Sequence, residues 1–146
     1  MSGRTPPLMT EVPPEIAKGV VRRLIAEVLN AGNLDVIDEL YAAELAPAAR
    51  RWIGAFHTSF SDVQMEIVEL VAEDEKVVGR FACSGTHQGE WRGHPPTGRR
   101  FERVDEVAIF DIRNGKIIKG WSLEDTLSRL EQLGLVPTMG SQLAVQ

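Results

Sequence analysis

An aspartate near the C-terminus, Asp125, is the first residue whose position suggests chemistry. It follows Trp121 by four residues, at the end of an apolar segment, in the stretch WSLED. A carboxylate acts as a general base on a carbon acid when an apolar pocket raises its pKa and a nearby group stabilises the enolate. Trp121 is suited to form an apolar wall of such a pocket, and packing in the core is its alternative role.

The same stretch also has the form of a helix start. Ser122 with an acid three residues later is typical of a capping motif, in which the serine caps the helix and the acidic residue favours its N-terminus. Spacing alone therefore favours a structural role for Asp125 over a catalytic one.

A second acid, Glu106, lies between Val104 and Ala108 on the apolar face of an alternating segment. A single carboxylate on an apolar face lies in a pocket or is paired with a cation. Its neighbour Asp105 lies on the opposite face, and alternation alone does not decide which face points inward. Glu106 is therefore a predicted pocket residue and an alternative or additional acid.

The segment 85–101, GTHQGEWRGHPPTGRRF, contains His87, Trp91 and His94. Tetrahedral zinc needs about four ligands, and neither an H-E-x-x-H pair nor a cysteine cluster is present, so we expect no metal. The segment also lacks the Lys-Ser/Thr ending of a phosphate loop. We expect its glycines and prolines to shape a connection between strands, with His87 hydrogen-bonded at a strand end and Trp91 at the cavity mouth or packed on the sheet. Both residues belong to the predicted pocket.

Composition narrows the class of protein. A chain of 146 residues predicts one domain, and a net charge of −5 gives no electrostatic reason to bind nucleic acid or a membrane surface. Cys83 is the only cysteine in the sequence, which excludes an internal disulfide and fits the reducing cytoplasm. No apolar run approaches the roughly 18 residues that span a bilayer. We therefore expect a cytoplasmic protein.

Periodicity predicts the elements that position these residues. Apolar residues at helical spacing predict helices at 15–30, 34–41 and 46–58. Alternation then predicts a hairpin over 63–86 and two strands at 101–112 and 116–123, which Asn114-Gly115 joins by a tight turn. A last helix at 123–133 ends at Gly134. This order predicts an α+β fold over residues 15–135, with a disordered lead at 1–14 and a tail at 136–146.

Such an arrangement also predicts a cavity. An antiparallel sheet of four strands twists, and one of its faces needs cover, which three N-terminal helices can supply. If the sheet curls around these helices, they do not fill its wide end, and a concave hollow results. Hollows of this kind are the preferred setting for small-ligand sites.

Several motifs resemble those of the SnoaL-like polyketide cyclases. They are Gly85-Thr86-His87, Pro95-Pro96-Thr97-Gly98, Asn114-Gly115-Lys116-Ile117, the W-x-x-x-D pattern of Trp121 and Asp125, and Gln132-Leu133-Gly134. The resemblance implies the cone-shaped nuclear-transport-factor-2-like fold, a curled sheet around a pocket, and commonly a homodimer made through the sheet. It also implies that Asp125 is the general acid and base, which reverses the preference for a capping role.

The activity implied by this resemblance needs no cofactor. It is an enzyme acting on a hydrophobic, carbonyl-bearing small molecule such as a polyketide intermediate, in which Asp125 removes a proton and the enolate attacks a second carbonyl held nearby. Related members hydroxylate, isomerise or open epoxides, and the sequence does not separate these reactions from cyclisation. The alternative from another class is a non-catalytic module that binds a lipophilic ligand or only dimerises, with Asp125 exposed at a helix start.

Overall fold

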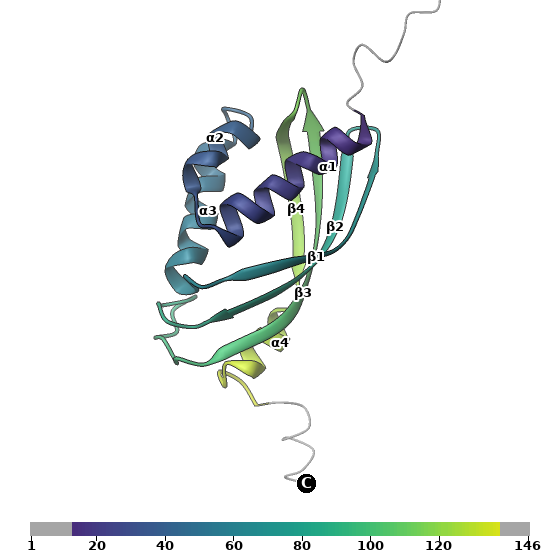
Figure 1. Ribbon diagram of the computed structural model, residues 1–146. Coiled ribbons are helices and arrows are strands. Elements are labelled where there is room, and N and C mark those ends of the chain that lie inside the picture. The colour runs from purple at the N-terminus through teal and green to yellow at the C-terminus, as the bar shows by residue number, and fades with distance from the viewer. Residues whose placement is uncertain (1–12, 138–146) are drawn as a thin grey trace, which may run out of the picture.

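A bent antiparallel sheet with helices against one of its faces forms the body of the molecule (Figure 1). The computed structural model describes residues 13–137. The elements follow in the order α1 (Pro14–Arg23), α2 (Ile37–Leu40), α3 (Ala46–Ser59), β1 (Gln64–Glu73), β2 (Lys76–Thr86), β3 (Arg100–Arg113), β4 (Lys116–Glu124) and α4 (Thr126–Gln132). This order confirms the predicted α+β fold. Residues 1–12 of the expected lead and 138–146 of the expected tail lie outside the described residues.

The helices match the predicted positions but differ in geometry. α1 continues as a π-helical segment, Leu24–Asn30, so the first predicted helix has two parts. The second predicted helix is a 3₁₀ turn, Leu34–Val36, followed by the short α2. Hydrophobic spacing detects the buried face of a helix but not whether its turns are wider, as in a π-helix, or tighter, as in a 3₁₀ helix. Within the part of the chain that the structure describes, no helix is long and apolar enough to cross a membrane.

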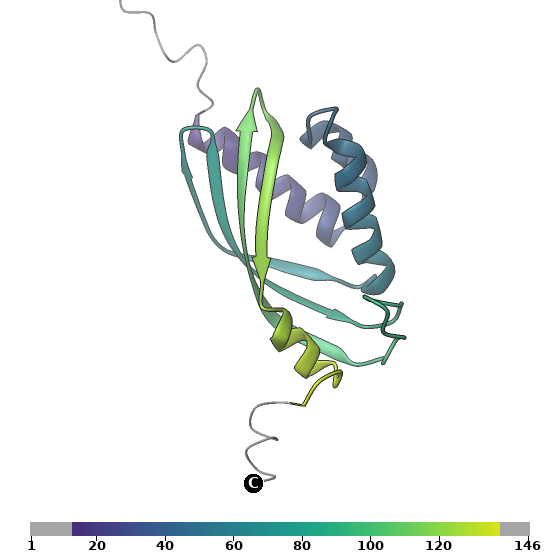
Figure 2. The same ribbon diagram turned by 180° about the vertical axis from the view of Figure 1, so that it is seen from behind.

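The four strands pair in sequence order, each antiparallel to the next. The predicted Asn114-Gly115 turn joins β3 to β4, and both residues have positive φ, as a tight hairpin turn requires. The pairing shifts between Ile67 and Glu69 and again between Cys83 and Gly85. Irregularities of this kind bend a strand and increase its twist. The sheet accordingly curls, and α1 and α3 lie on one side of it (Figure 2).

Apolar side chains form two clusters. The main core joins α1, the π-helical segment and α2 to the concave face of the sheet through residues such as Val21, Val28, Ile37 and Phe81. A second cluster, here called the aromatic cluster, consists of Phe56, Phe60, Trp91 and Phe101 and lies where α3, the 87–99 connection and α4 meet β3. The cavity of the candidate site is lined mainly by residues of the main core, and Phe56 of the aromatic cluster also borders it.

The last helix begins later than the sequence predicts. β4 extends to Glu124, because Glu124 pairs with Glu106 and the backbone N–H of Asp125 donates to the carbonyl of Asp105 (2.9 Å). Asp125 is the N-cap of α4, and its carboxylate accepts from the Ser128 N–H at 3.1 Å. The prediction of Ser122 as the cap was therefore wrong, because that residue still belongs to the strand.

Candidate active site

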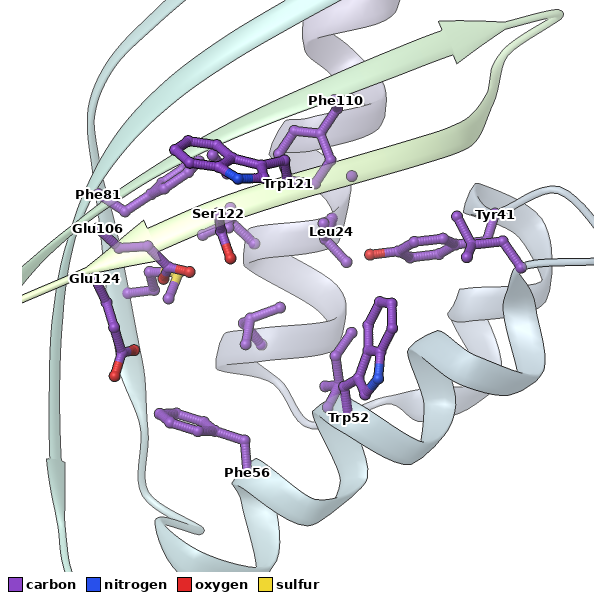
Figure 3. A pocket seen from close by; sticks show the side chains of 17 residues that line it. Leu24, Tyr41, Trp52, Phe56, Phe81, Glu106, Phe110, Trp121, Ser122 and Glu124 are labelled. Carbon is purple, nitrogen blue, oxygen red and sulfur yellow. The ribbon is translucent and has the colours of Figure 1, made fainter. Parts of the chain in front are cut away.

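The helices and the concave face of the sheet enclose an open-ended cavity of about 390 Å³ (Figure 3). Most of its wall is apolar. The helical side contributes Leu24, Ile25, Leu29, Trp52, Ile53 and Phe56, and the sheet contributes Met65, Phe81, Ala108 and Phe110. A mostly apolar hollow with a few polar groups is typical of a small-molecule site.

Two carboxylates lie together at one end of this cavity. Glu106 of β3 and Glu124 of β4 are partners in the strand register, and both line the cavity. Side chains of directly opposed residues lie on the same face of a sheet, with Cβ atoms about 5 Å apart. Figure 3 shows both carboxyl groups directed into the cavity from the sheet.

Glu106 is the titratable group of the pair that burial affects most clearly. Burial raises the pKa of Glu106 to about 7, and the negative charge of Glu124 acts in the same direction. The positive charge of Arg129 and a hydrogen bond from Ser122 oppose this rise. Glu106 therefore exists in comparable amounts of acid and base near neutral pH, which suits a group that must take up and return a proton.

Glu124 is held by a cation from the last helix. The Arg129 guanidinium donates to the Glu124 carboxylate, as does the Thr126 hydroxyl at 3.2 Å. Arg129 is only 1% exposed, and its guanidinium lies between 4.6 and 5.8 Å from all four rings of the aromatic cluster. Its planar cation thus combines an ion pair with contacts to aromatic rings. This arrangement balances the charge of Glu124 and leaves Glu106 without a comparable cation.

A phenol lies at the other end of the cavity. Tyr41 follows α2, is 6% exposed, and directs its hydroxyl into the cavity from the side opposite Glu106 (Figure 3). Burial raises the pKa of Tyr41 to about 12, so the hydroxyl keeps its proton at neutral pH. The cavity thus has an acid–base end and a hydrogen-bond-donor end separated by apolar walls.

The structure brings two of the predicted site residues to the cavity. Glu106 lines it as described, which settles that its face of β3 points inward. Trp121 borders the cavity from the edge strand β4, but strand alternation places its side chain on the face opposite to that of Gly120 and Ser122, and it is 53% exposed. Asp125 is exposed, is not among the lining residues and caps α4, so its predicted catalytic role stays a prediction.

The structure places His87 and Trp91 in or beside the aromatic cluster and not in the cavity wall. The ring centroids of both residues lie within 5.7 Å of the Phe60 ring centroid. His87 Nδ1 accepts from the Thr97 N–H at 3.2 Å and lies 3.1 Å from the Thr97 hydroxyl oxygen. His87 is thus hydrogen-bonded just after the end of β2, as the sequence predicts.

The connection 87–99 has the structural role that its composition predicts. Gly93 and Gly98 have positive φ, and a side chain at Gly89 would collide with the Thr58 carbonyl.

Residues 13–137 contain no cluster of three His, Cys, Asp or Glu side chains arranged to hold a metal ion. Cys83 is buried, and burial raises the pKa of its thiol to about 12, which makes it a poor nucleophile.

Sequence reasoning missed three residues of this site. Glu124 was considered only as part of a helix-start motif, although two-residue alternation from Ser122 places it on the Glu106 face. Tyr41 was assigned to the apolar face of the second helix, and nothing in the pattern indicates that its hydroxyl reaches a cavity. Arg129 lies among leucines in the last helix, and a lone cation on an apolar helix face is a usable signal for a buried ion pair.

Comparison with known proteins agrees with this architecture. The family model described as SnoaL-like polyketide cyclase matches residues 19–133, which span the helices, the sheet and the cavity. The chain belongs to the SnoaL-like polyketide cyclase family. Its fold is the nuclear-transport-factor-2-like cone that the motifs predict.

Two curated proteins are distant relatives of this chain. The chain is 32% identical over 108 residues to the aklanonic acid methyl ester cyclase DnrD of Streptomyces peucetius, covering 74% of this chain and 72% of that protein. It is 30% identical over 115 residues to the aklanonic acid methyl ester cyclase DauD of Streptomyces sp. (strain C5), covering 79% and 70%. Among solved structures, TsrD from Streptomyces laurentii superposes with a TM-score of 0.80 at 25% identity, covering 86% of this chain and all of that one.

Proposed function

We propose that this member of the SnoaL-like family is a cofactor-independent enzyme that cyclises a hydrophobic, carbonyl-bearing polyketide, with Glu106 as the group that moves the proton. The observation that carries this proposal is a carboxyl group with a pKa of about 7 in the wall of an apolar cavity. The names of the two cyclase relatives support an ester-bearing polyketide as the substrate class.

The reaction is an intramolecular aldol addition. Ionised Glu106 takes a proton from the carbon next to a carbonyl, and the resulting enolate carbon attacks a second carbonyl of the same molecule. A carbon–carbon bond forms, the attacked oxygen becomes an alkoxide, and protonated Glu106 returns the proton to it. All atoms are conserved, and neither an oxidant nor a metal enters the balance.

The surrounding residues support both halves of this cycle. The apolar walls exclude water and hold the two reacting carbons close together, and this proximity supplies much of the rate acceleration. Arg129 binds Glu124, so the second carboxylate is neutralised locally and need not take the proton itself. Ser122, opposite Ala108 in the register and hydrogen-bonded to Glu106, holds the reacting carboxyl group.

Asp125, predicted from the W-x-x-x-D pattern, remains the rival for the proton-transfer role. Its carboxylate is exposed and accepts a backbone hydrogen bond at the start of α4. The preceding residue, Glu124, does line the cavity. If α4 began one residue earlier or later, Asp125 could take the place of Glu124 in the cavity wall. We therefore treat Glu106 and Asp125 as alternatives that substitution separates.

The non-catalytic alternative also has a specific observation in its favour. It predicts Asp125 exposed at a helix start, and that is where the structure has it. It further predicts that Ser122 binds a backbone amide, whereas Asp125 itself caps the helix, and that no hollow lies within reach of the Asp125 carboxylate, which is not among the lining residues. Binding without turnover of any carbonyl-bearing compound would favour this alternative.

The experiment is a product assay on aklanonic acid methyl ester, the compound in the names of the relatives. An intramolecular aldol addition yields a product of unchanged mass that has one carbonyl fewer. We expect Glu106→Gln to lower the rate by roughly 100-fold or more, in the range known for general bases. The matched control is Glu102→Gln, which removes an exposed carboxylate from the same strand and leaves the cavity intact. Equal turnover by both variants would refute the role of Glu106.

The homodimer implied by the resemblance also remains a proposal. Apolar residues gather on the outer face of the sheet, where Val71, Val78, Val107 and Leu123 are all more than a third exposed. An apolar sheet face of this kind is suited to pack against a second copy. Light scattering of the purified chain measures its mass, and a monomer at high concentration would contradict the proposal.

A further inference from the structure

Tyr41 is a mostly buried residue whose hydroxyl has no part in the proton-transfer scheme. Tyr41 is 6% exposed, and its hydroxyl is directed into the cavity. Among residues 13–137 this hydroxyl has no hydrogen-bond partner, and its oxygen is not one of the fully buried unpaired atoms, so solvent reaches it in the open cavity. A ligand that fills this end of the cavity displaces that solvent, and a hydroxyl left unpaired by the ligand then costs free energy.

We propose that the Tyr41 hydroxyl donates a hydrogen bond to an acceptor oxygen of the substrate at the end of the cavity remote from Glu106. This inference rests on the proposed function, because it uses the same cavity and assigns its second polar contact. It makes Tyr41 a specificity-determining residue and requires a substrate with oxygen functions at both ends of an apolar body.

The backbone fixes the position of this phenol. Tyr41 forms an isolated parallel bridge with Ile117 of β4, and the next residue, Ala42, donates from its N–H to the Ile117 carbonyl at 2.9 Å. The Tyr41 N–H is bound to the carbonyl of Ile37 in α2. The residue is therefore attached both to the helix before it and to the strand that contains Ser122 and Glu124. A donor held in this way loses little entropy when it binds a ligand.

The chemistry of the surroundings limits the partner. Figure 3 shows Leu24 and Trp52 beside Tyr41, and neither side chain has an acceptor that could take the proton of the hydroxyl. The raised pKa of Tyr41 keeps the group neutral, which makes it a donor to a carbonyl, quinone or ester oxygen and unsuited to bind a cation. An entirely apolar ligand would leave the hydroxyl unpaired, so the site discriminates against it.

A pair of rigid probes isolates this contact. 9-Fluorenone and fluorene share one tricyclic skeleton and differ in one ketone oxygen, and equilibrium dialysis measures their binding to the purified chain. The measurement is made at pH 8.5, where Glu106 is mostly ionised and can only accept, while Tyr41 still donates. We expect wild type to bind fluorenone about 3- to 10-fold more tightly than fluorene, the range for one neutral hydrogen bond.

Substitutions assign the preference to a residue. Tyr41→Phe keeps the ring and removes the hydroxyl, so it should bind both probes equally and should bind fluorene at least as tightly as wild type does. The latter result shows that the variant is folded with an intact cavity. Ser122→Ala, which removes the other hydroxyl of the lining, should keep the preference. A Tyr41→Phe variant that still prefers fluorenone, or a wild type with no preference, overturns the inference.

The same design separates this inference from the proposed function. Glu106→Gln should lose turnover of the polyketide ester but keep the fluorenone preference, because its substitution lies at the other end of the cavity. If Glu106→Gln remains fully active while Tyr41→Phe loses the preference, the acid–base proposal fails and the Tyr41 contact stands. If Glu106→Gln loses turnover while Tyr41→Phe keeps the preference for fluorenone, only the Tyr41 contact is rejected.

Discussion

Glu106 and Glu124 lie directly opposite each other in the register of β3 and β4, and both belong to the cavity wall. Two like charges on one face of a sheet repel each other, and the buried cation Arg129 binds Glu124. The pair is therefore asymmetric. One carboxylate has a fixed counter-ion, and the other has a pKa near neutrality and the freedom to exchange a proton.

The raised pKa of Glu106 predicts a pH-dependent stability. Its pKa rises from 4.5 to about 7 on folding, so the native state binds more protons than the unfolded state between these values. The stabilisation is complete below about pH 4.5 and is lost as the pH rises through 7, by about 3 kcal/mol at most.

Urea denaturation of wild type and Glu106→Gln at pH 5 and pH 8.5 measures this effect. Glutamine does not titrate, so only wild type loses this stabilisation as the pH rises. The free energy of unfolding of the variant minus that of wild type should therefore increase by about 2 to 3 kcal/mol from pH 5 to pH 8.5. A constant difference would show that the pKa of Glu106 is not raised in the native protein.

Arg129 is predicted to be the most sensitive charged residue for stability. Arg129→Met removes the counter-ion of Glu124 and leaves a mostly buried carboxylate unpaired, which should cost about 3 to 5 kcal/mol. Arg129→Lys keeps the charge but loses the planar contacts to the four rings, so its loss should be smaller. Chemical denaturation compares them, and the double variant Arg129→Met with Glu124→Gln should recover part of the loss. Absence of any recovery would contradict the ion-pair explanation.

Asp125 should behave as a helix cap. Asp125→Ala removes the acceptor for the Ser128 N–H and should lower the free energy of unfolding by about 1 kcal/mol. Asp125→Asn keeps a capping oxygen and should cost less. If Asp125→Asn folds normally but loses turnover, the catalytic role inferred from the W-x-x-x-D pattern is supported instead.

Gly120 offers a way to fill the cavity without disturbing the main core. A Cβ at this position would contact the Phe110 ring at an ordinary 3.6 Å, and the residue lines the cavity from the edge strand. Gly120→Leu should therefore fold, because a strand gains from a side chain, while its isobutyl group occupies ligand space. We expect fluorene binding to weaken at least 10-fold while the urea midpoint is not lowered. Unchanged binding would place the ligand elsewhere.

Much of the fold is predictable from periodicity alone. The alternation in β3 and the Asn114-Gly115 turn specify two strands and their hairpin, and helical spacing from Ile16 to Leu29 specifies the first helix. Boundaries are less accurate where two local signals compete. Ser122 has a capping pattern, yet cross-strand pairing extends β4 past it, because ladder hydrogen bonds to β3 are a tertiary effect.

The site is predictable only in part, because a sequence pattern does not show which face of the sheet is concave or which distant residues meet in the folded chain. Glu106 is recognisable as an acid on an apolar face, but parity does not determine which face is concave. His87 and Trp91 have the residue types of a site, and packing against Phe60 makes them structural. Tyr41 and Glu106 are 65 positions apart in the chain, and only the folded sheet brings them to opposite ends of one cavity.

The pH dependence of kcat/KM for polyketide cyclisation tests the central claim most directly. If Glu106 is the base, kcat/KM of wild type rises with pH to a plateau with an apparent pKa of about 7, Glu106→Gln loses both the rate and this pKa, and Asp125→Asn keeps both. A profile that is unchanged in Glu106→Gln and abolished in Asp125→Asn would contradict the account.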